Sequence, residues 1–452
     1  MLVVEPHDTS TPWDLAIVGA GAAGLATAIF VARRLPAWRV VLLDGAVRPG
    51  AKILVSGGGR CNVTNRVVQA SDYNGGSPHV IRRVLAAFTV DQTLAFFREI
   101  GVALHEEPRG KMFPDSNSAR TVLDALLAEV SRRGVRLLAG YRVTAVAKEA
   151  VAAQTADRAG RFRLETTHGA LSADRVVLAT GGLSLPKTGS DGAGYGFAQA
   201  LGHSLVPPTP ALDPLVLEGA FHAPLAGVSH EAALTVHVDG QRPVRRRGPL
   251  LWTHFGVSGP VALDVSRFVN RASVEGRSAS VTLSCLPEAN FEAAEQAFLH
   301  VAATQPRATL RSALANLPSA LATQPCAPVE SGGCAPQLPA RLTHALLTVA
   351  GVDGHVTLAQ LARDHRRRLL QTLLAWPLPV VGSRGYKYAE VTAGGVPLDE
   401  VDARLHSRCC PGLYLVGEIL DVDGRIGGFN FQWAWSGAWA LANGLAQEQG
   451  GS

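Results

Sequence analysis

The sequence predicts an α/β protein whose first domain contains a parallel sheet, and three observations support this prediction. A short apolar segment at residues 15–18 leads into a glycine-rich turn and then into a helical segment. A second apolar segment follows at residues 40–43. Apolar residues make up 47% of the 452 residues and charged residues 17%, which permits a large core and excludes global disorder. We expect two or three domains.

The segment Leu15–Ala32 carries no charge and also fits the hydropathy of a membrane helix or signal anchor. The residues before it contain Glu5, Asp8 and Asp14 and no basic region, which argues against a signal peptide. Three glycines interrupt the segment. We therefore expect a strand, a turn and a helix, and a protein with no membrane partner.

The turn contains Gly19, Gly21 and Gly24 in the spacing GxGxxG. The first glycine allows a tight turn, the second lets the backbone approach a pyrophosphate, and the third lets helix and strand pack closely. The helix N-terminus offers N–H groups to phosphates. The second strand ends at Asp44, whose carboxylate can accept hydrogen bonds from a ribose. The pattern predicts a Rossmann-like domain for FAD or NAD and does not separate the two.

A second glycine-rich segment, residues 50–65, has polar residues around a run of three glycines: Lys52, Ser56, Gly57, Gly58, Gly59, Arg60 and Asn62. Backbone N–H groups and an arginine fit a phosphate or the polar edge of a flavin ring, and a flexible loop is the alternative. Cys61 is either a redox thiol or a packed cysteine, and the second interpretation is favoured because no other cysteine is near it in sequence.

The middle of the first domain is predicted to contain short helices and strands. We expect helices at 78–88, at 91–101 and from Asn117 or Ser118 to Gly134, a loop at 108–114, and strands at 135–138, 142–147, 161–166 and 175–179. The last strand ends at Thr180 and Gly181. In flavoproteins of the two-dinucleotide-binding type, a strand of this kind completes the first half of the domain and ends beneath the cofactor. A short helix is expected at 197–201.

The C-terminal part is a strand that ends in Gly417 and Glu418, followed by a polar segment and a helix from Trp433 to Leu445. The segment contains Asp421, Asp423, Gly427, Gly428 and Asn430. A carboxylate there can bind the flavin ribityl hydroxyls, and the helix N-terminus can stabilise negative charge on a reduced flavin. The carboxylates could instead form a metal cluster, but no histidine lies near them and we expect no metal.

Six motifs together are similar to the BaiN-like (YhiN-type) FAD-dependent oxidoreductases over nearly the whole chain. They are GAGAAGLATA, KILVSGGGRCNVTN, GKMFPDSNSARTVLDAL, VVLATGGLSLPKTGSDGAGYGFAQALGH, THFGVSGP and GLYLVGEILDVDGRIGGFNFQWAWSGAWA. The chain departs from the family pattern by having Asp44 where glutamate is commoner and Gly437 where serine is common.

The resemblance implies a Rossmann-like FAD-binding domain of the two-dinucleotide-binding flavoprotein type with an inserted β-barrel and a helical cap. The FAD domain is expected at 1–202 and 385–452, the barrel-like domain at 203–285 with 377–392 as a further part of it, and the helical insert at 286–376. The helical insert is rich in Ala and Leu, and its last helix is expected at 358–376 after Thr357.

The residues that we expect to contact FAD are Gly19, Gly21, Ala22, Ala23, Gly24, Asp44, Lys52, Ser56, Gly57, Gly58, Gly59, Arg60, Cys61, Asn62, Val143, Thr180, Gly181, Gly417, Glu418, Asp421, Gly427, Gly428 and Asn430. The catalytic candidates are His254 and Lys52. His254 suits contact with substrate or acid–base work, and a hydrogen-bonded structural histidine is the alternative. Lys111 and Tyr386 are weaker pocket candidates.

Three functions fit the sequence. The first is a flavin reductase or dehydrogenase acting on a small molecule such as an enone, with NAD(P)H as transient reductant. The second is an oxidase that uses O₂ after oxidising an amine. The third is a flavin-binding protein with an RNA or protein partner, motivated by the arginine runs at 245–247 and 366–368; a net charge of only +5 counts against nucleic acid, and solvated faces explain the runs.

Six cysteines fit a reducing, cytoplasmic setting. Cys326 and Cys334 are expected either to pair or to lie in a linker.

Overall fold

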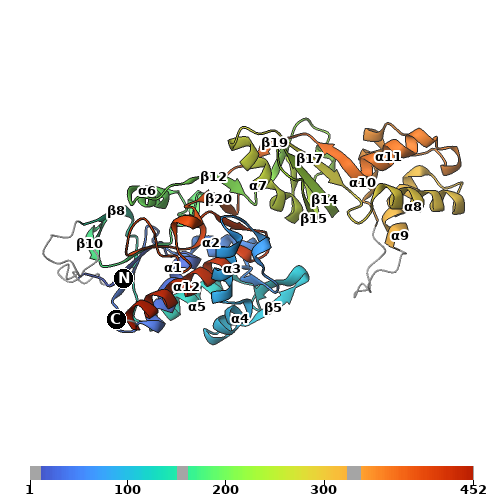
Figure 1. Cartoon of the computed structure of the whole chain (residues 1–452). Coiled ribbons are helices and arrows are strands. Elements are labelled where there is room, and N and C mark those ends of the chain that lie inside the picture. The colour runs from blue at the N-terminus through green and yellow to red at the C-terminus, as the bar shows by residue number, and fades with distance from the viewer. Residues whose placement is uncertain (1–11, 150–160, 323–336, 451–452) are drawn as a thin grey trace. The chain divides into compact units, whose positions relative to one another are not determined.

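The structure is a computed structural model that describes residues 12–149, 161–322 and 337–450, so Cys326 and Cys334 lie outside the described residues. The chain divides into two compact units (Figure 1), of which the first comprises Met1–Ala211 and Tyr386–Ser452 and the second Leu212–Gly385. Each unit has its own hydrophobic core. The sequence placed the corresponding boundaries at 202 and 385, and its further separation of a barrel from a helical insert stays a prediction.

The first unit is built on a five-stranded sheet in which every neighbouring pair is parallel. Its strands in spatial order are β21 (Leu413–Leu415), β11 (Val176–Leu178), β1 (Leu15–Val18), β2 (Val40–Asp44) and β7 (Arg136–Ala139). The C-terminal strand β21 therefore completes a sheet that the N-terminal half of the chain begins.

The uncharged segment Leu15–Ala32 divides into β1 and helix α1 (Ala22–Arg34), as the sequence predicted. Every residue of α1 from Ala23 to Ala32 is buried, which explains a run with no polar face. Across the described part of the chain, no helix has the length and apolar character needed to span a membrane.

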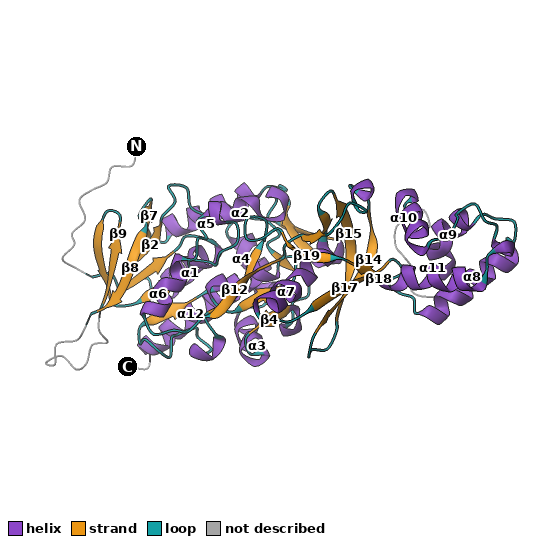
Figure 2. Cartoon of the chain, turned by 90° about the horizontal axis from the view of Figure 1, so that it is seen from above, coloured by secondary structure: helices purple, strands orange, loops and turns teal. Residues whose placement is uncertain are grey.

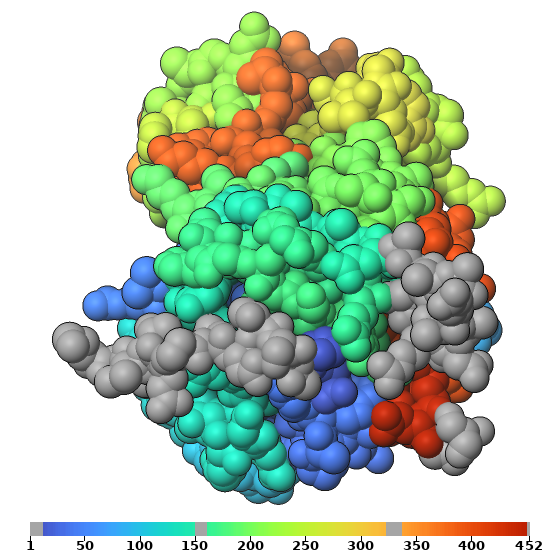
Figure 3. Space-filling model, turned by 90° about the vertical axis from the view of Figure 1, so that its left-hand side faces the viewer, coloured from blue at the N-terminus to red at the C-terminus, as the bar shows by residue number. Residues whose placement is uncertain are grey.

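Helix α12 (Phe429–Gly450) packs along α1 (Figures 1 and 2), so the two ends of the sequence share one core. In Figure 3 the red end of α12 lies beside the blue N-terminal residues on one face of the unit. The other helices of the unit are α2 (Ala51–Val55), α3 (Pro78–Ala87), α4 (Val90–Glu99), α5 (Ala119–Arg132) and α6 (Ala193–Ala200).

Small antiparallel sheets surround the parallel one. They are β8 (Val143–Lys148) with β9 (Phe162–Thr166) and β10 (Gly169–Ala173); β3 (Thr64–Asn65) with β6 (Lys111–Pro114) and β5 (Leu104–Glu107); β4 (Tyr73–Gly75) with β22 (Val422–Gly424); and β12 (Val206–Ala211) with β20 (Val391–Gly395). Two of these pairings, β4–β22 and β12–β20, again join distant parts of the sequence.

Four local predictions were wrong, and one of them is the start of α12, which lies at Phe429 rather than at Trp433. Residues 111–114 form strand β6 rather than a loop, because β3 and β5 supply partners on both sides that the sequence does not reveal. Helix α6 begins at Ala193 rather than 197, since Gly192 adopts the left-handed conformation directly before it. The helix expected from 358 is α11 (Arg363–Ala375), preceded by a separate 3₁₀ turn at Leu358–Gln360.

The second unit contains a seven-stranded antiparallel sheet. Its order is β18 (Trp376–Leu378), β17 (Ala279–Ser284), β14 (Ser229–Val238), β15 (Val244–Thr253), β16 (Gly256–Ser258), β13 (Leu215–Leu217) and β19 (Val380–Ser383). Strands β18 and β19 occupy opposite edges although only Pro379 separates them in sequence. The sheet must therefore curl until its edges meet, as in a barrel.

Helix α7 (Pro260–Val274) packs on β14 and β15 of this sheet. The remaining helices are α8 (Phe291–Thr304), α9 (Leu310–Ala322), α10 (Ala340–Ala350) and α11. Their buried apolar side chains belong to the same core as the sheet.

Asp213 joins the two places where the chain enters and leaves the second unit. Its Oδ2 accepts a hydrogen bond from the backbone N–H of Gly385 at 2.6 Å, and its Oδ1 is buried without a hydrogen-bond partner among the described residues. Burial raises the pKa of Asp213 to about 6, against the opposing effect of hydrogen bonds from Ser383 and Gly385.

A pKa that is higher in the folded than in the unfolded protein stabilises the fold at low pH, and this contribution is lost as pH rises through about 6. We expect Asp213→Asn to remove this pH-dependent contribution. As pH rises through the pKa, the free energy of unfolding should therefore fall by less in the variant than in the wild type. Urea unfolding measures this difference. Asp239→Asn, at an exposed position of the same unit, is the control; equal pH dependence in wild type and Asp213→Asn would contradict the raised pKa.

Candidate nucleotide and redox site

The turn between β1 and α1 is held by a very close backbone approach. An ideal Cβ added to Gly24 would lie 1.8 Å from the carbonyl oxygen of Gly19. Gly19 itself has a φ of +103°, and its N–H donates to the carbonyl of Leu43 at 2.7 Å. Both glycines are therefore required by the protein's own packing.

Gly21 is different, because nothing in the described part of the protein requires glycine there. Its φ is −82°, and an added Cβ would have no heavy atom within 4 Å. It directly precedes Ala22 and Ala23, the first residues of α1, whose N–H groups have no intrahelical acceptor. The arrangement leaves open space over a backbone that presents N–H donors and the positive end of a helix dipole, which suits a phosphate.

Asp44 lies at the end of β2 beside this turn. Its Oδ2 accepts from the N–H of Ala20 and its Oδ1 from the N–H of Ala46, each at 2.7 Å. These bonds fix the carboxylate next to the glycine turn, and each oxygen keeps a further lone pair for a ribose hydroxyl.

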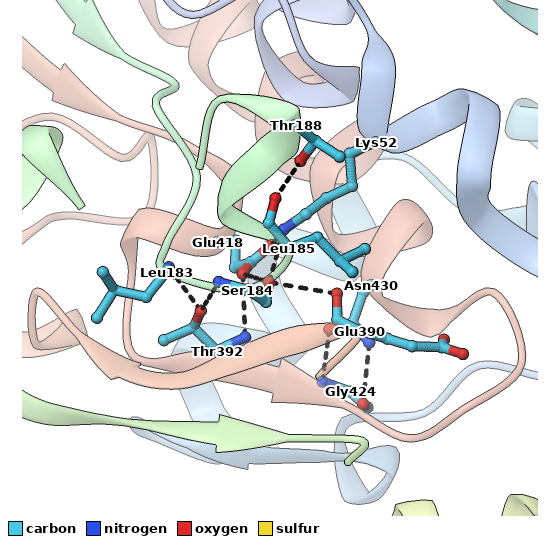
Figure 4. A network of polar contacts seen from close by, with 10 residues as sticks. All are labelled: Lys52, Leu183, Ser184, Leu185, Thr188, Glu390, Thr392, Glu418, Gly424 and Asn430. Carbon is cyan, nitrogen blue, oxygen red and sulfur yellow. Dashed lines mark hydrogen bonds and ion pairs between the residues drawn. The ribbon is translucent and has the colours of Figure 1, made fainter. Parts of the chain in front are cut away.

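Lys52 and Glu418, 366 positions apart in sequence, meet in a polar network (Figure 4). The Nζ of Lys52 donates to Glu418 Oε2 and to Ser184 Oγ, both at 2.7 Å. Glu418 Oε1 accepts from Ser184 Oγ at 2.7 Å and from the N–H of Thr392 at 3.0 Å. The carboxylate thus has a fixed position among donors from three other segments of the first unit.

Sequence reasoning missed Ser184 and Thr392. Thr392 Oγ1 accepts from the N–H groups of Leu183 and Ser184, at 2.8 and 3.0 Å, so β20 fixes the segment that follows β11. The signal for Ser184 was its place two residues after the glycine pair at 181–182. Thr392 gave no local signal, because its role depends on the pairing of β12 with β20.

Two buried hydroxyl oxygens in this region, Thr180 Oγ1 and Tyr195 OH, have no hydrogen-bond partner among the described residues. Gly181 has a φ of +73°, and an added Cβ on Gly182 would lie 2.9 Å from the Tyr195 hydroxyl. Burial and then the charge of Glu418 raise the pKa of Tyr195, so its phenol stays protonated. Unpaired buried hydroxyls are costly unless a ligand satisfies them.

The second glycine-rich segment bends through three left-handed residues, Gly57, Gly58 and Gly59, all exposed. Ser56 Oγ donates to the carbonyl of Ile53. The guanidinium of Arg60 pairs with Glu107 and lies 4.0 Å from the ring centre of Phe113, so the described contacts direct it toward β5 and β6.

Cys61 and Asn62 follow this segment, and both side chains are buried. Cys61 is fully buried, and burial raises the pKa of its thiol to about 12. Asn62 is also buried, and its Oδ1 accepts from the N–H of Met112 at 3.2 Å.

The C-terminal glycines and Asn430 shape the entry to α12. An added Cβ on Gly428 would lie 2.4 Å from the backbone of Thr64. Gly417 has a φ of +80°, and a Cβ added to it would lie 2.8 Å from the Cβ of Ala23. Asn430 bonds both the N–H and the carbonyl of Gly424. Gly427 accepts through its carbonyl from Asn65. Asp421 is buried, and its backbone bonds Gly76 and Val396.

Of the remaining candidates, Tyr386 borders this network through Leu185, the neighbour of Ser184, whereas Val143, Lys111 and His254 belong to other elements. Val143 is buried at the start of β8. Lys111 begins β6, and Tyr386 bonds Leu185 through its carbonyl. His254 lies exposed in the turn between β15 and β16 of the second unit, with its ring against Phe255.

A group of His203, Glu400 and Cys409 has the residue types of a metal site. Ser407 Oγ accepts from the N–H groups of Cys409 and Cys410, so its own proton points to His203 Nε2 at 2.8 Å. His203 Nδ1 then carries the proton that is donated to Glu400 at 2.7 Å. Both ring nitrogens are used, and the group is a hydrogen-bonded cluster.

The parallel sheet and the glycine turn define a protein with a Rossmann-type domain. The family model described as HI0933-like protein Rossmann domain matches residues 13–444, and the chain belongs to this family. The chain is 34% identical to a ribosomal RNA dihydrouridine synthase of Escherichia coli over 96% of this chain and 98% of the relative. It is 32% identical to a 3-dehydro-bile acid delta(4,6)-reductase of Clostridium scindens over 96% and 99%.

Among solved structures, a 3-ketosteroid delta1-dehydrogenase from Sterolibacterium denitrificans matches 97% of this chain and 100% of its own with 12% identity and a TM-score of 0.48.

Substitution by alanine is expected to change the stability of the protein differently at Gly24 and at Gly21. We expect Gly24→Ala to lower the free energy of unfolding by about 3 kcal/mol or more, because the added carbon meets a backbone oxygen. Gly21→Ala should leave the stability of the ligand-free protein unchanged or slightly raised. Thermal and urea unfolding of both apoproteins measure this, and similar losses in both variants would contradict the assignment.

The buried thiol of Cys61 predicts selective labelling. At neutral pH we expect iodoacetamide to modify exposed Cys409 while Cys61 and Cys285 stay unmodified until the protein unfolds, because both buried thiols have pKa values of about 12. Peptide mass spectrometry identifies the labelled residues. Rapid labelling of Cys61 in the folded protein would restore its interpretation as a redox thiol.

Proposed function

We propose that the chain is an FAD-dependent reductase that adds hydrogen across a C=C bond conjugated to a carbonyl group. The observation that carries the proposal is the open space over Gly21 at the start of α1, beside a glycine pair that the fold itself requires. FAD would place its pyrophosphate there and a ribose at Asp44.

The chemistry of the surrounding groups supports FAD over a smaller nucleotide. Thr180 Oγ1 and Tyr195 OH are buried and have no hydrogen-bond partner among the described residues, and Glu418 is a fixed carboxylate that can accept from ribityl hydroxyls. These groups come from the end of β11, from α6 and from the segment after β21, so they extend the site away from the Gly21 turn along the carboxyl ends of parallel strands. A ligand longer than a mononucleotide would satisfy them.

When bound, FAD supplies hydride transfer from its ring to the substrate. Lys52 holds a positive charge between Glu418 and Ser184, and it would favour an anionic reduced ring or an oxygen that gains charge on the substrate. The N-terminus of α12, entered through Gly427 and Gly428, would add to this stabilisation. Tyr195 holds a proton that it can donate in a hydrogen bond.

The names of the two relatives support the reaction class. One is named for making dihydrouridine in ribosomal RNA and the other for reducing the delta(4,6) bonds of a 3-dehydro bile acid. In both names a C=C bond conjugated to a carbonyl gains hydrogen. We extend this shared chemistry to the present chain, with NAD(P)H as the expected transient electron donor. The oxidase alternative has no comparable observation in its favour.

Anaerobic mixing of the purified, flavin-loaded protein tests the proposal. We expect NADH or NADPH to bleach the flavin absorbance and a small enone to restore it, while amines leave it unchanged. Bleaching by amines and recovery with O₂ alone would establish the oxidase instead.

A matched pair of variants tests the cofactor part. Gly21→Val should abolish retention of FAD, whereas Gly196→Val, an equally unhindered glycine on α6, should retain it. Retention of FAD by Gly21→Val with unchanged affinity would contradict the proposed position of the pyrophosphate.

A further inference from the structure

An ion pair joins two segments that leave the parallel sheet on either side of the glycine turn. Arg142 lies three residues after the end of β7, and Asp191 lies between β11 and α6. Strands β1 and β2 stand between β11 and β7 in the sheet. Because all five strands are parallel, both segments emerge at the carboxyl edge, where the turn at residues 19–24 and Asp44 also lie. The ion pair therefore connects the two sides of the edge along which we place FAD.

Arg142 reaches this position from beside the proposed ribose site. A Cβ added to Gly45, the residue after Asp44, would lie 3.3 Å from both Cβ and Cγ of Arg142. The backbone of Arg142 is fixed by Thr167, whose Oγ1 accepts from the N–H of Arg142 at 3.2 Å and whose N–H donates to the carbonyl of Arg142 at 3.0 Å. At the far end of the side chain, Nη2 donates to Asp191 Oδ2 at 2.5 Å. The arginine side chain thus runs from the neighbourhood of Asp44 to the segment that follows β11.

Asp191 is fixed independently on the opposite side. Its Oδ1 accepts from the N–H of Ala193, the first residue of α6, at 3.1 Å. This end of α6 lies against Thr180, because a Cβ added to Gly194 would lie 1.8 Å from Thr180 Oγ1. Helix α6 also packs beside β8, which begins directly after Arg142 (Figure 1). The ion pair therefore ends next to the helix turn that contacts Thr180, whose hydroxyl has no hydrogen-bond partner among the described residues.

Within the described residues, neither Arg142 nor Asp191 forms an ion pair with a third side chain. Both side chains are partly exposed, at 48% for Arg142 and 38% for Asp191. An ion pair with this exposure contributes little to the stability of a fold, because water and salt screen it. Its effect on a ligand that has to pass it is different. The pair must break before the ligand can leave, so its strength adds to the barrier for dissociation.

We infer that Arg142 and Asp191 form a clasp across the ADP part of FAD, and that this clasp must open before the cofactor can leave. The inference rests on the proposed function, because it requires the pyrophosphate at Gly21 and the ribose at Asp44. Both residues of the clasp are positioning residues, which act on the release of the cofactor through their contact with each other. Removal of either charge should therefore have the same consequence as removal of both.

The rate at which FAD leaves the flavin-loaded protein tests the clasp. After dilution into buffer without FAD, the flavin absorbance of an ultrafiltrate measures the released cofactor over time. We expect Arg142→Gln and Asp191→Asn each to raise the release rate about threefold, and the double variant to raise it no further. Asparagine keeps the oxygen that accepts from Ala193, so the second variant removes only the charge. Arg142→Lys should release FAD at a rate close to that of the wild type. Salt at about 1 M should accelerate release from the wild type but not from the double variant.

Arg161→Gln/Asp174→Asn is the matched control. Both side chains of this ion pair are 42% exposed, but Asp174 precedes β11 and so lies at the amino edge of the sheet, away from the proposed site. Its removal should leave the release rate unchanged, and thermal unfolding of the ligand-free proteins should change little in any variant. Equal release by the wild type and the double variant, equal acceleration by the control and test pairs, or acceleration only in variants that unfold at a lower temperature would overturn this inference alone. A wild-type protein that binds no FAD would overturn the proposed cofactor and the clasp with it.

Discussion

The first unit depends on one backbone contact, the approach of Gly24 to the carbonyl of Gly19. Neither position has room for a side chain, so α1 can lie directly against the strand from which it emerges. That placement brings the start of α1 to the carboxyl end of the parallel sheet and buries the helix on all sides. The unobstructed backbone at Gly21 follows from it, and so does the position of Asp44, which is bonded to the same turn.

The remainder of the site comes from the other end of the chain. Strand β21 joins the sheet beside β11, and Glu418 follows it directly. Lys52 and Ser184 reach Glu418 from two further segments, and Thr392 positions Ser184 through β20. The second unit is inserted between β12 and β20, two strands that pair with each other, so the chain leaves and re-enters the first unit at neighbouring points. Because of this connectivity, the second unit can change in sequence and length while the Lys52–Glu418 site of the first unit is preserved.

The sequence predicted those parts of the fold that local patterns encode. The strand, turn and helix at 15–34, the strand ending at Asp44 and the C-terminal strand before Glu418 carry apolar runs and glycines at fixed spacing, and each was found. The strand at 111–114 was missed because it is short and exists through its partners β3 and β5. Thr392 was missed for the same reason. The Lys52–Glu418 contact was not predicted as a pair, since no local pattern records a separation of 366 residues.

A single ligand explains both the space over Gly21 and the groups beyond it: the pyrophosphate of FAD would occupy that space, while Glu418 and the hydroxyls of Thr180 and Tyr195 would face the rest of the molecule. A crystal structure of the purified protein with its flavin tests this directly. We expect density for the pyrophosphate against the first turn of α1 and hydrogen bonds from the ligand to Glu418 and to at least one of the two hydroxyls. Flavin density elsewhere, with protein side chains closing the space over Gly21, would contradict this assignment.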